Sequence, residues 1–266
     1  MSMFDSILGQ VLTAEAELYR ACSRLRAGTD DEALHDLRIQ LRRLRSLLRP
    51  LRTINAVARL DDSVAQLARL TSPVRDLEVL LGELERTGHA ESAASRRGNL
   101  LAVYRQVLQS DELATLFAEL DAWPGSFQLE RLSGHTRKLK KRVRQRLNKQ
   151  IKRLTDALAN QHFDRHELRV LTKRTRYMLD AYPRQASVAK AVIASLKALQ
   201  SALGTWHDLH QWCLKADVEP DLEPLLADWQ RGSSDALQDA EAEIVRLRTL
   251  LDACRKGRHP ELADEC

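Results

Sequence analysis

The sequence predicts an all-α protein made of two related halves, and three observations lead to that prediction. The chain has 266 residues and is 44% hydrophobic, but it contains only 10 glycines and 7 prolines, so turn-forming residues are scarce. Its apolar residues repeat with a helical period in segments rich in leucine, alanine, arginine, glutamate and glutamine. A pattern of basic residues occurs twice, and no stretch alternates convincingly like a β-strand.

The first half should contain six helices. The first covers Met3–Arg26 and ends at Gly28, a residue typical of helix C-caps. The second covers Ala33–Arg52, and Pro50 should kink or end it. The others are Val57–Leu70, a helix with Ser72 as N-cap and Pro73 at its first position, Leu100–Leu108 and Glu112–Leu120.

The segment Trp123-Pro124-Gly125-Ser126 is the strongest interruption of the helical pattern, so we place the boundary there. The predicted halves are therefore residues 1–125 and 126–266. The expected helices of the second half are Leu129–Leu158, Asp164–Tyr182, Val188–Leu203 followed by Gly204 at the C′ position, a short helix around Trp206–Leu209, and Asp235–Arg255.

Basic residues form a stripe on the predicted helix Ala33–Arg52. At 3.6 residues per turn they share an arc of roughly 100°. This first basic stripe consists of His35, Arg38, Arg42, Arg45, Arg49 and Arg52. The neighbouring arc carries leucines and should be buried. Stacked guanidinium groups repel one another by a few tenths of a kcal/mol per pair, roughly, so a negatively charged ligand should compensate them.

The stripe recurs 131 residues later. The second basic stripe consists of His166, Arg169, Lys173 and Arg176. Arg75-Asp76-Leu77 likewise corresponds to His207-Asp208-Leu209. Such an internal duplication predicts two pseudo-symmetric helical bundles related by a pseudo-twofold, with the two stripes facing each other across a shared basic groove. Asp180 ends the second stripe where Arg49 continues the first, so that end of the site should be weaker.

These motifs resemble the CHAD family, the conserved histidine α-helical domain. The family pattern is close to H-x-L-R-[IV]-x-x-[KR]-[KR]-x-R, followed by a D-L-x-V-L element. The matching segments are His35–Arg45, His166–Arg176, Pro73–Leu80 and Leu203–Leu209. The resemblance implies two four-helix bundles around a basic channel that binds inorganic polyphosphate, often at polyphosphate granules. The ExExK strand of the triphosphatase often fused to this domain is not found in the sequence, so we expect a stand-alone binding module.

Further cations extend the candidate site. Residues 137–153 carry ten Lys or Arg and no acid, whereas residues 217–252 carry ten acids and three Arg, within a net charge of +5. The favoured stripe of the basic helix is Lys138, Arg142, Arg146, Lys149 and Arg153, and the alternative is Arg137, Lys141, Arg144 and Lys152. Arg146 and Arg153 flank the apolar face more closely, but the spacing leaves the choice open. Arg75, Lys197 and His207 are expected near the ends of the groove.

Polyphosphate fits this pattern because it has repeated charges and no bases. A helix presents one cation per turn, about 5.4 Å apart, and guanidinium groups bind two oxygens at once. His35 and His166 would donate to phosphate or serve as capping or packing residues. His162 with His166, and His207 with His210, supply two nitrogens each, half a metal site at best. We therefore expect no metal and no cofactor.

Two other functions remain as alternatives. Nucleic-acid binding is disfavoured because aromatic residues make up 5% of the chain and neither stripe contains Phe or Trp for base stacking. A phosphoanhydride-processing enzyme is disfavoured because Asp76 and Asp208 fit caps or arginine partners better than a Mg²⁺ site, so no catalytic residues are expected.

The expected location is the cytoplasm, and two features of the sequence favour it. The four cysteines have no metal-ligand spacing and fit reduced thiols, and no apolar run or leader predicts a membrane span or a signal peptide. We expect localisation at polyphosphate granules, with granule-associated proteins as further partners.

Overall fold

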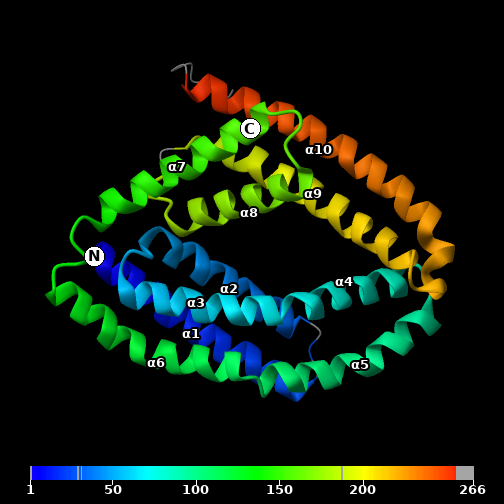
Figure 1. Ribbon diagram of the computed structural model, residues 1–266, viewed down its shortest axis with the longest axis horizontal. Coiled ribbons are helices and arrows are strands. Elements are labelled where there is room, and N and C mark those ends of the chain that lie inside the picture. The colour runs from blue at the N-terminus through cyan, green and yellow to red at the C-terminus, as the bar shows by residue number, and fades with distance from the viewer. Residues whose placement is uncertain (1, 29, 31, 187, 256–266) are drawn as a thin grey trace, which may run out of the picture. The chain divides into compact units, whose positions relative to one another are not determined.

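All regular secondary structure in the described part of the chain is helical. The computed structural model describes residues 2–28, 30, 32–186 and 188–255, and every regular element among them is a helix, which confirms the all-α prediction (Figure 1). In chain order the elements are α1 (Met3–Ala27), α2 (Ala33–Leu48), the 3₁₀ helix η1 (Arg49–Leu51), α3 (Asn55–Leu70), α4 (Ser72–Arg86), α5 (Ala90–Leu108), α6 (Asp111–Leu132), α7 (Leu139–Ala159), α8 (Arg165–Ala181), α9 (Lys190–Ala216), the 3₁₀ helix η2 (Pro220–Leu225) and α10 (Leu226–Arg255).

The chain divides into two compact units, residues 1–144 and 145–266. The first unit holds α1 to α6 and the start of α7, and the second holds the rest of α7 and α8 to α10. The boundary predicted between residues 125 and 126 instead lies inside α6, which runs unbroken from Asp111 to Leu132. The segment that was predicted to interrupt the helical pattern is therefore helical.

α6 continues through Pro124 because its apolar face continues on both sides of the proline. Trp123 and Phe127 are buried and their rings stack at 4.4 Å, and Phe4 of α1 stacks on Phe127 at 4.5 Å. A proline inside a helix costs about 3 kcal/mol, and burying an aromatic side chain gains roughly 1.5–3 kcal/mol for each ring. Two buried aromatic rings offset the loss of one backbone hydrogen bond.

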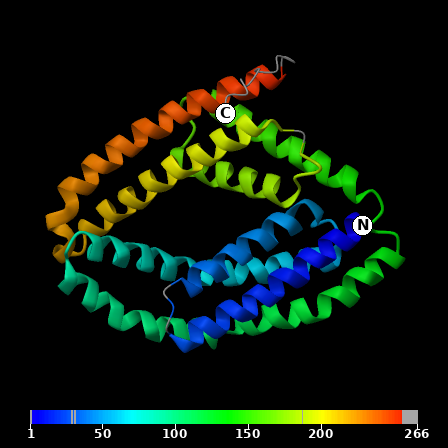
Figure 2. The same ribbon diagram turned by 180° about the vertical axis from the view of Figure 1, so that it is seen from behind.

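In the first unit, α2 lies between α1 and α3, while α3 also packs on α6 and α4 on α5 (Figures 1 and 2). The leucine face of α2 is buried as predicted, including Leu37, Leu41, Leu44 and Leu48. α2 ends at Leu48, and Pro50 sits in the 3₁₀ helix that follows, so the expected break occurs. Burial of this face leaves the basic stripe along one edge of α2.

In the second unit, α8 packs against α9, and α9 and α10 run side by side along most of their length (Figure 2). Contrary to prediction, Gly204 does not end a helix, and no separate helix surrounds Trp206, because α9 extends to Ala216. Its apolar face continues past the glycine: Leu209 lies against Gly232 of α10, and the rings of Trp212 and Trp229 are 5.4 Å apart. Packing on α10 outweighs the local tendency of glycine to stop the helix.

The predicted helix Leu129–Leu158 is divided by a turn at residues 133–138, in which Gly134 has φ 78° and Lys138 has φ 64°. Gly28 caps α1 as predicted, with φ 67° and its N–H donating to the Arg24 carbonyl. Thr29 and Asp31, part of the predicted start signal of the second helix, lie outside the described residues.

Within the described residues, no helix combines the length and apolarity that crossing a lipid bilayer requires. Cys22, Cys213 and Cys254 are free thiols, and Cys266 lies outside the described part of the chain.

Replacing Phe127 with alanine should lower the free energy of unfolding by about 3–5 kcal/mol, because it empties a fully buried ring site between two other rings. Urea unfolding followed by circular dichroism measures the change. Leu129→Ala is the matched control on the same helix: Leu129 is 64% exposed, so its change should stay within about 0.5 kcal/mol. Equal effects of the two substitutions would contradict the aromatic anchor of α6.

Candidate functional site

A cluster of basic side chains forms in the first unit where α2 and α4 approach each other. We define the first cluster as His35, Arg38 and Arg42 of α2 with Arg75 of α4. His35 is half-buried, and burial lowers its pKa most, followed by the charge of Arg75; Glu32 opposes this shift, and Arg42 and Asp36 have smaller effects of opposite sign. The imidazole is therefore neutral near pH 7 and lies among cations.

Arg38 points into the junction between α3 and α4. Its Nη1 donates to the Ala68 carbonyl at 3.2 Å and to Thr71 Oγ1 at 2.9 Å, and its Nη2 donates to Ser72 Oγ at 3.1 Å. All three acceptors are neutral. Burial and the charge of Arg42 lower the pKa of Arg38. Arg38 thus joins α2 to this junction, and Ser72, predicted as an N-cap, instead serves as one of its partners while Thr71 occupies the N-cap position.

Arg75 is held by a short chain of polar contacts on α4 and α5. Its Nη1 lies 2.9 Å from a carboxylate oxygen of Glu78, and the Tyr104 hydroxyl donates to the other oxygen. Asp76, predicted as a cap or an arginine partner, is not the N-cap of α4, but its charge does act on Arg38. Arg75 therefore approaches His35 from a fixed position on α4.

The other end of the first basic stripe surrounds a buried carboxylate. Arg45 Nε lies 3.7 Å from Asp61 Oδ1, and Arg52 Nε lies 3.2 Å from Oδ2. The Asp61 side chain is 1% exposed, and burial raises its pKa even though Arg45, Arg49 and Arg52 act to lower it. Three predicted arginines of the stripe are thus gathered around an acid of α3.

The sequence analysis missed Asp61, although a signal was present. Val57, Leu60, Val64 and Leu67 form the buried face of α3, and Asp61 falls within their helical spacing. A charged residue at a core position requires an opposite charge nearby, and the stripe of α2 offers one. The pairing could have been inferred from that rule.

A second cluster forms in the second unit between α8 and α9. We define it as His166, Arg169 and Lys173 of α8 with His207 of α9. The Nδ1 atoms of His166 and His207 are 3.4 Å apart, and the ring centroids are 4.9 Å apart. The pKa of His207 is lowered to about 4, chiefly by burial and then by the charges of Arg169, His166, His210 and Lys173 in that order. The surroundings of His207 are strongly positive.

The remaining predicted residues of the second unit do not join this cluster. Arg176 Nη1 donates to Gln200 at 3.1 Å, and its Nε lies 3.6 Å from Asp180. Lys197 is exposed and lies ten residues before His207, about 15 Å along the helix axis.

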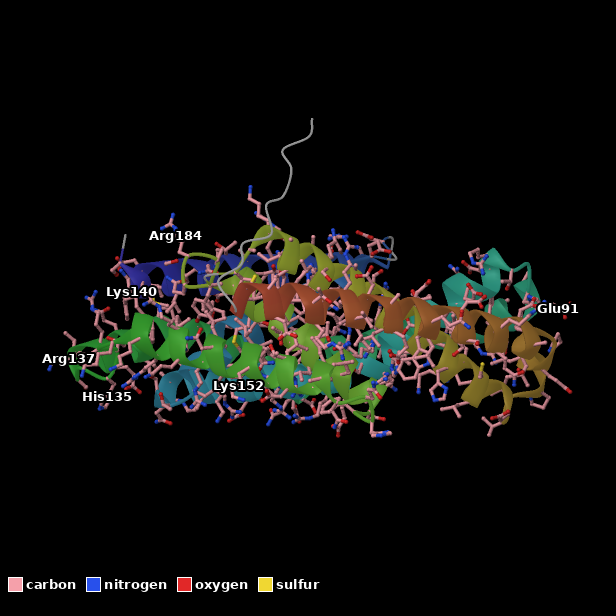
Figure 3. All side chains as sticks on the ribbon, turned by 90° about the horizontal axis from the view of Figure 1, so that it is seen from above. Glu91, His135, Arg137, Lys140, Lys152 and Arg184 are labelled. Carbon is pink, nitrogen blue, oxygen red and sulfur yellow. The ribbon has the colours of Figure 1, made fainter. Side chains whose placement is uncertain are left out.

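The basic helix α7 carries both predicted stripes on exposed surface. Lys138 lies in the turn before it, Arg142 donates to the His135 carbonyl at 2.8 Å, and Arg146, Lys149 and Arg153 are exposed. Arg137 and Lys140, near its start, extend away from the ribbon (Figure 3).

α7 meets a side of α8 that differs from the one with the basic stripe. Gln150 Nε2 of α7 donates to Thr175 Oγ1 of α8 at 3.0 Å. Arg169 and Lys173 lie roughly 120–160° around α8 from Thr175. This contact does not bring either basic stripe of α7 to the second cluster. Which of the two stripes faces the ligand therefore stays a prediction.

Histidine is the one residue type in the two clusters, as defined, that commonly ligates metal ions. In the part of the chain that the structure describes, no three His, Cys, Asp or Glu side chains lie together as metal ligands would. His166 and His207 provide two nitrogens beside Arg169 and Lys173, and such cations oppose metal binding.

Comparisons with known proteins give the family and the fold. The CHAD domain matches residues 10–216. No curated protein matches the sequence. The crystal structure of the CHAD domain from the plant Ricinus communis is similar, with 24% identity, a TM-score of 0.59, and coverage of 99% of this chain and 93% of that one. PptA from Streptomyces chartreusis is similar with 18% identity, a TM-score of 0.56, and coverage of 91% and 99%, respectively.

Replacing Arg38 with alanine should destabilise the first unit by about 1–3 kcal/mol, because it removes three hydrogen bonds to the α3–α4 junction. Urea unfolding measures this loss. Arg43→Ala removes the same charge from an exposed position of α2 and should change stability by less than about 0.5 kcal/mol. An unfolding midpoint of Arg38→Ala equal to that of the control would show that the junction does not depend on Arg38.

Proposed function

The chain belongs to the CHAD domain family, and from that premise we propose that it binds inorganic polyphosphate through its two histidine-containing basic clusters. The observation that carries the proposal is the recurrence of one arrangement in both units. His35 lies beside Arg75 in the first, and His166 lies beside His207 in the second. These pairs occupy corresponding positions of the sequence repeat, which supports an internal duplication. That the clusters line one shared groove stays a prediction.

The electrostatics of the clusters favour a polyanion. Burial is the main cause that lowers the pKa of His35, Arg38 and His207, and neighbouring cations lower each of these pKa values further, so the cations of each cluster oppose further protonation. The same potential attracts phosphate oxygens. Guanidinium and ammonium groups bind such oxygens directly, and release of counterions should supply much of the affinity, as it does for nucleic acids.

We further propose a binding module rather than an enzyme, acting as a scaffold or targeting protein at polyphosphate granules in the cytoplasm. The proposal rests on the chemistry of the clusters, which are cationic and neutral. Phosphoanhydride processing normally uses carboxylates that hold Mg²⁺ beside the phosphates. Glu78, a carboxylate beside the first cluster, is engaged with Arg75 and Tyr104.

RNA binding is a second candidate because one aromatic residue lies beside the second cluster, outside the stripes themselves. Trp206 is next to His207 on α9, with ring centroids 6.4 Å apart, and it is half-buried. It also stacks on His210 at 5.6 Å. An indole at a basic cluster can stack on a base. Competition between polyphosphate and single-stranded RNA of equal charge distinguishes the candidates, and preference for RNA would reverse their order.

Titration with polyphosphate of defined length at several salt concentrations tests the proposed function. Affinity should fall steeply as salt rises, and Lys173→Gln should weaken binding several-fold and reduce the salt slope by about one, because one phosphate contact is lost. Lys190→Gln removes the same charge from an exposed position at the start of α9 and should leave affinity nearly unchanged. Absence of binding by the unmodified protein would refute the proposal.

Polyphosphate affinity should rise as pH falls from about 7 toward 5. The pKa of His207 is about 4 in the free protein, and a bound polyanion would raise it, so binding takes up a proton in the interval between the two pKa values. Affinity should level off below about pH 4, where the free protein is protonated too and binding takes up no further proton. Calorimetry in buffers of different ionisation enthalpy counts the protons.

His207→Gln should reduce this proton uptake. His135→Gln is the control, because His135 lies in the first unit, away from the second cluster, and pairs there with Glu130. Equal uptake by both variants would show that His207 is not the linked group.

A further inference from the structure

Asp61 is a buried carboxylate placed against the basic stripe that the proposed function requires. Its side chain is 1% exposed, and Arg45 and Arg52 approach its two oxygens at 3.7 and 3.2 Å. Neither oxygen accepts a hydrogen bond from the described part of the chain. Arg52 also donates to Asp62, an exposed acid next in sequence, at 2.5 Å.

The acid occupies the groups that a phosphate would use. Carboxylate and phosphate oxygens bind the same N–H donors of guanidinium groups. A carboxylate withdrawn from water is stabilised chiefly by nearby opposite charge, so Asp61 depends on these arginines. Arg45, Arg49 and Arg52 all act to keep Asp61 ionised despite its burial. This end of the stripe therefore has a counter-anion supplied by the protein.

The other end of the stripe differs in its partners. Arg38 donates to one carbonyl and two hydroxyl groups, none of them charged. Around His35, the charges of Arg75 and Arg42 act against those of Glu32 and Asp36. The first basic stripe thus has one end where Arg38 donates only to neutral acceptors and another end where the buried Asp61 neutralises the arginines of α2.

The second unit has a weaker counterpart. Asp180 lies 3.6 Å from Arg176, but its side chain is 48% exposed and Arg176 also donates to Gln200. Solvent screens such an exposed pair, so it should compete little with a ligand. The buried Asp61 is the stronger candidate.

We propose that Asp61 is a built-in competitor of the polyanion, which holds Arg45, Arg49 and Arg52 and confines binding in the first unit to the first cluster. This inference rests on the proposed function. It reassigns Arg45 and Arg49, predicted from sequence as ligand contacts, to the internal acid. From His35 to Arg42 the helix rises about 10 Å, whereas from His35 to Arg49 it rises about 21 Å. Asp61 therefore limits the length of polyphosphate that α2 can contact.

Asp61→Asn and Asp62→Asn form a matched pair of variants, since each removes one negative charge from neighbouring positions of α3. Binding of long and short polyphosphate is measured for both at several salt concentrations. Asp61→Asn should bind long chains roughly three- to tenfold tighter with a steeper salt slope, because about one phosphate contact is added. It should gain less for short chains. Asp62→Asn, at an acid that is 59% exposed, should gain less than about twofold.

A double-variant cycle keeps the test independent of any change in stability. Arg52→Gln should change affinity by less than about twofold in the unmodified protein, but it should reverse part of the gain in the Asp61→Asn background. Equal gains in Asp61→Asn and Asp62→Asn, or a loss in Asp61→Asn, would overturn the inference while leaving the proposed function intact. Failure of the unmodified protein and all variants to bind polyphosphate would refute both.

Discussion

Burial of the leucine face of α2 is the constraint on which the rest of the first unit depends. Leu37, Leu41 and Leu44 are at most 1% exposed, which fixes the rotation of the helix about its axis. The arginines, interleaved with them in sequence, must then lie along the edges of that face. The N-terminal end of the stripe lies near α4, and its C-terminal end lies against α3. The packing of the leucines therefore decides which charges the arginines encounter.

The all-α fold and most helices could be predicted because they follow from period and caps alone. The spacing of Leu37 and Leu41 indicated a buried face, and Gly28 indicated the end of a helix. Pro124 and Gly204 misled the prediction, since both are local signals that long-range packing overrides. Trp123 packs on Phe127, and Leu209 packs on α10, and neither contact can be read from neighbouring residues.

The residues that form the two clusters could be predicted from the sequence, but the partner of each cation could not. The repeat pointed to His35, Arg75, His166 and His207, and the structure brings them together in pairs within their units. The direction of each arginine was not predictable, because a side chain of that length reaches several neighbours. Arg38 turns to a helix junction rather than along the stripe. Such choices depend on tertiary contacts that periodicity does not contain.

The path of α7 has a consequence for how the protein can be taken apart. Residues 139–144 belong to the first unit and the remainder of the same helix to the second. Cutting the chain in the turn at residues 133–138 would leave α6 and α7 whole. The buried residues Leu139 and Val143, which belong to the first unit, would then be on the C-terminal fragment. The two units therefore share α7, and neither contains the whole of that helix.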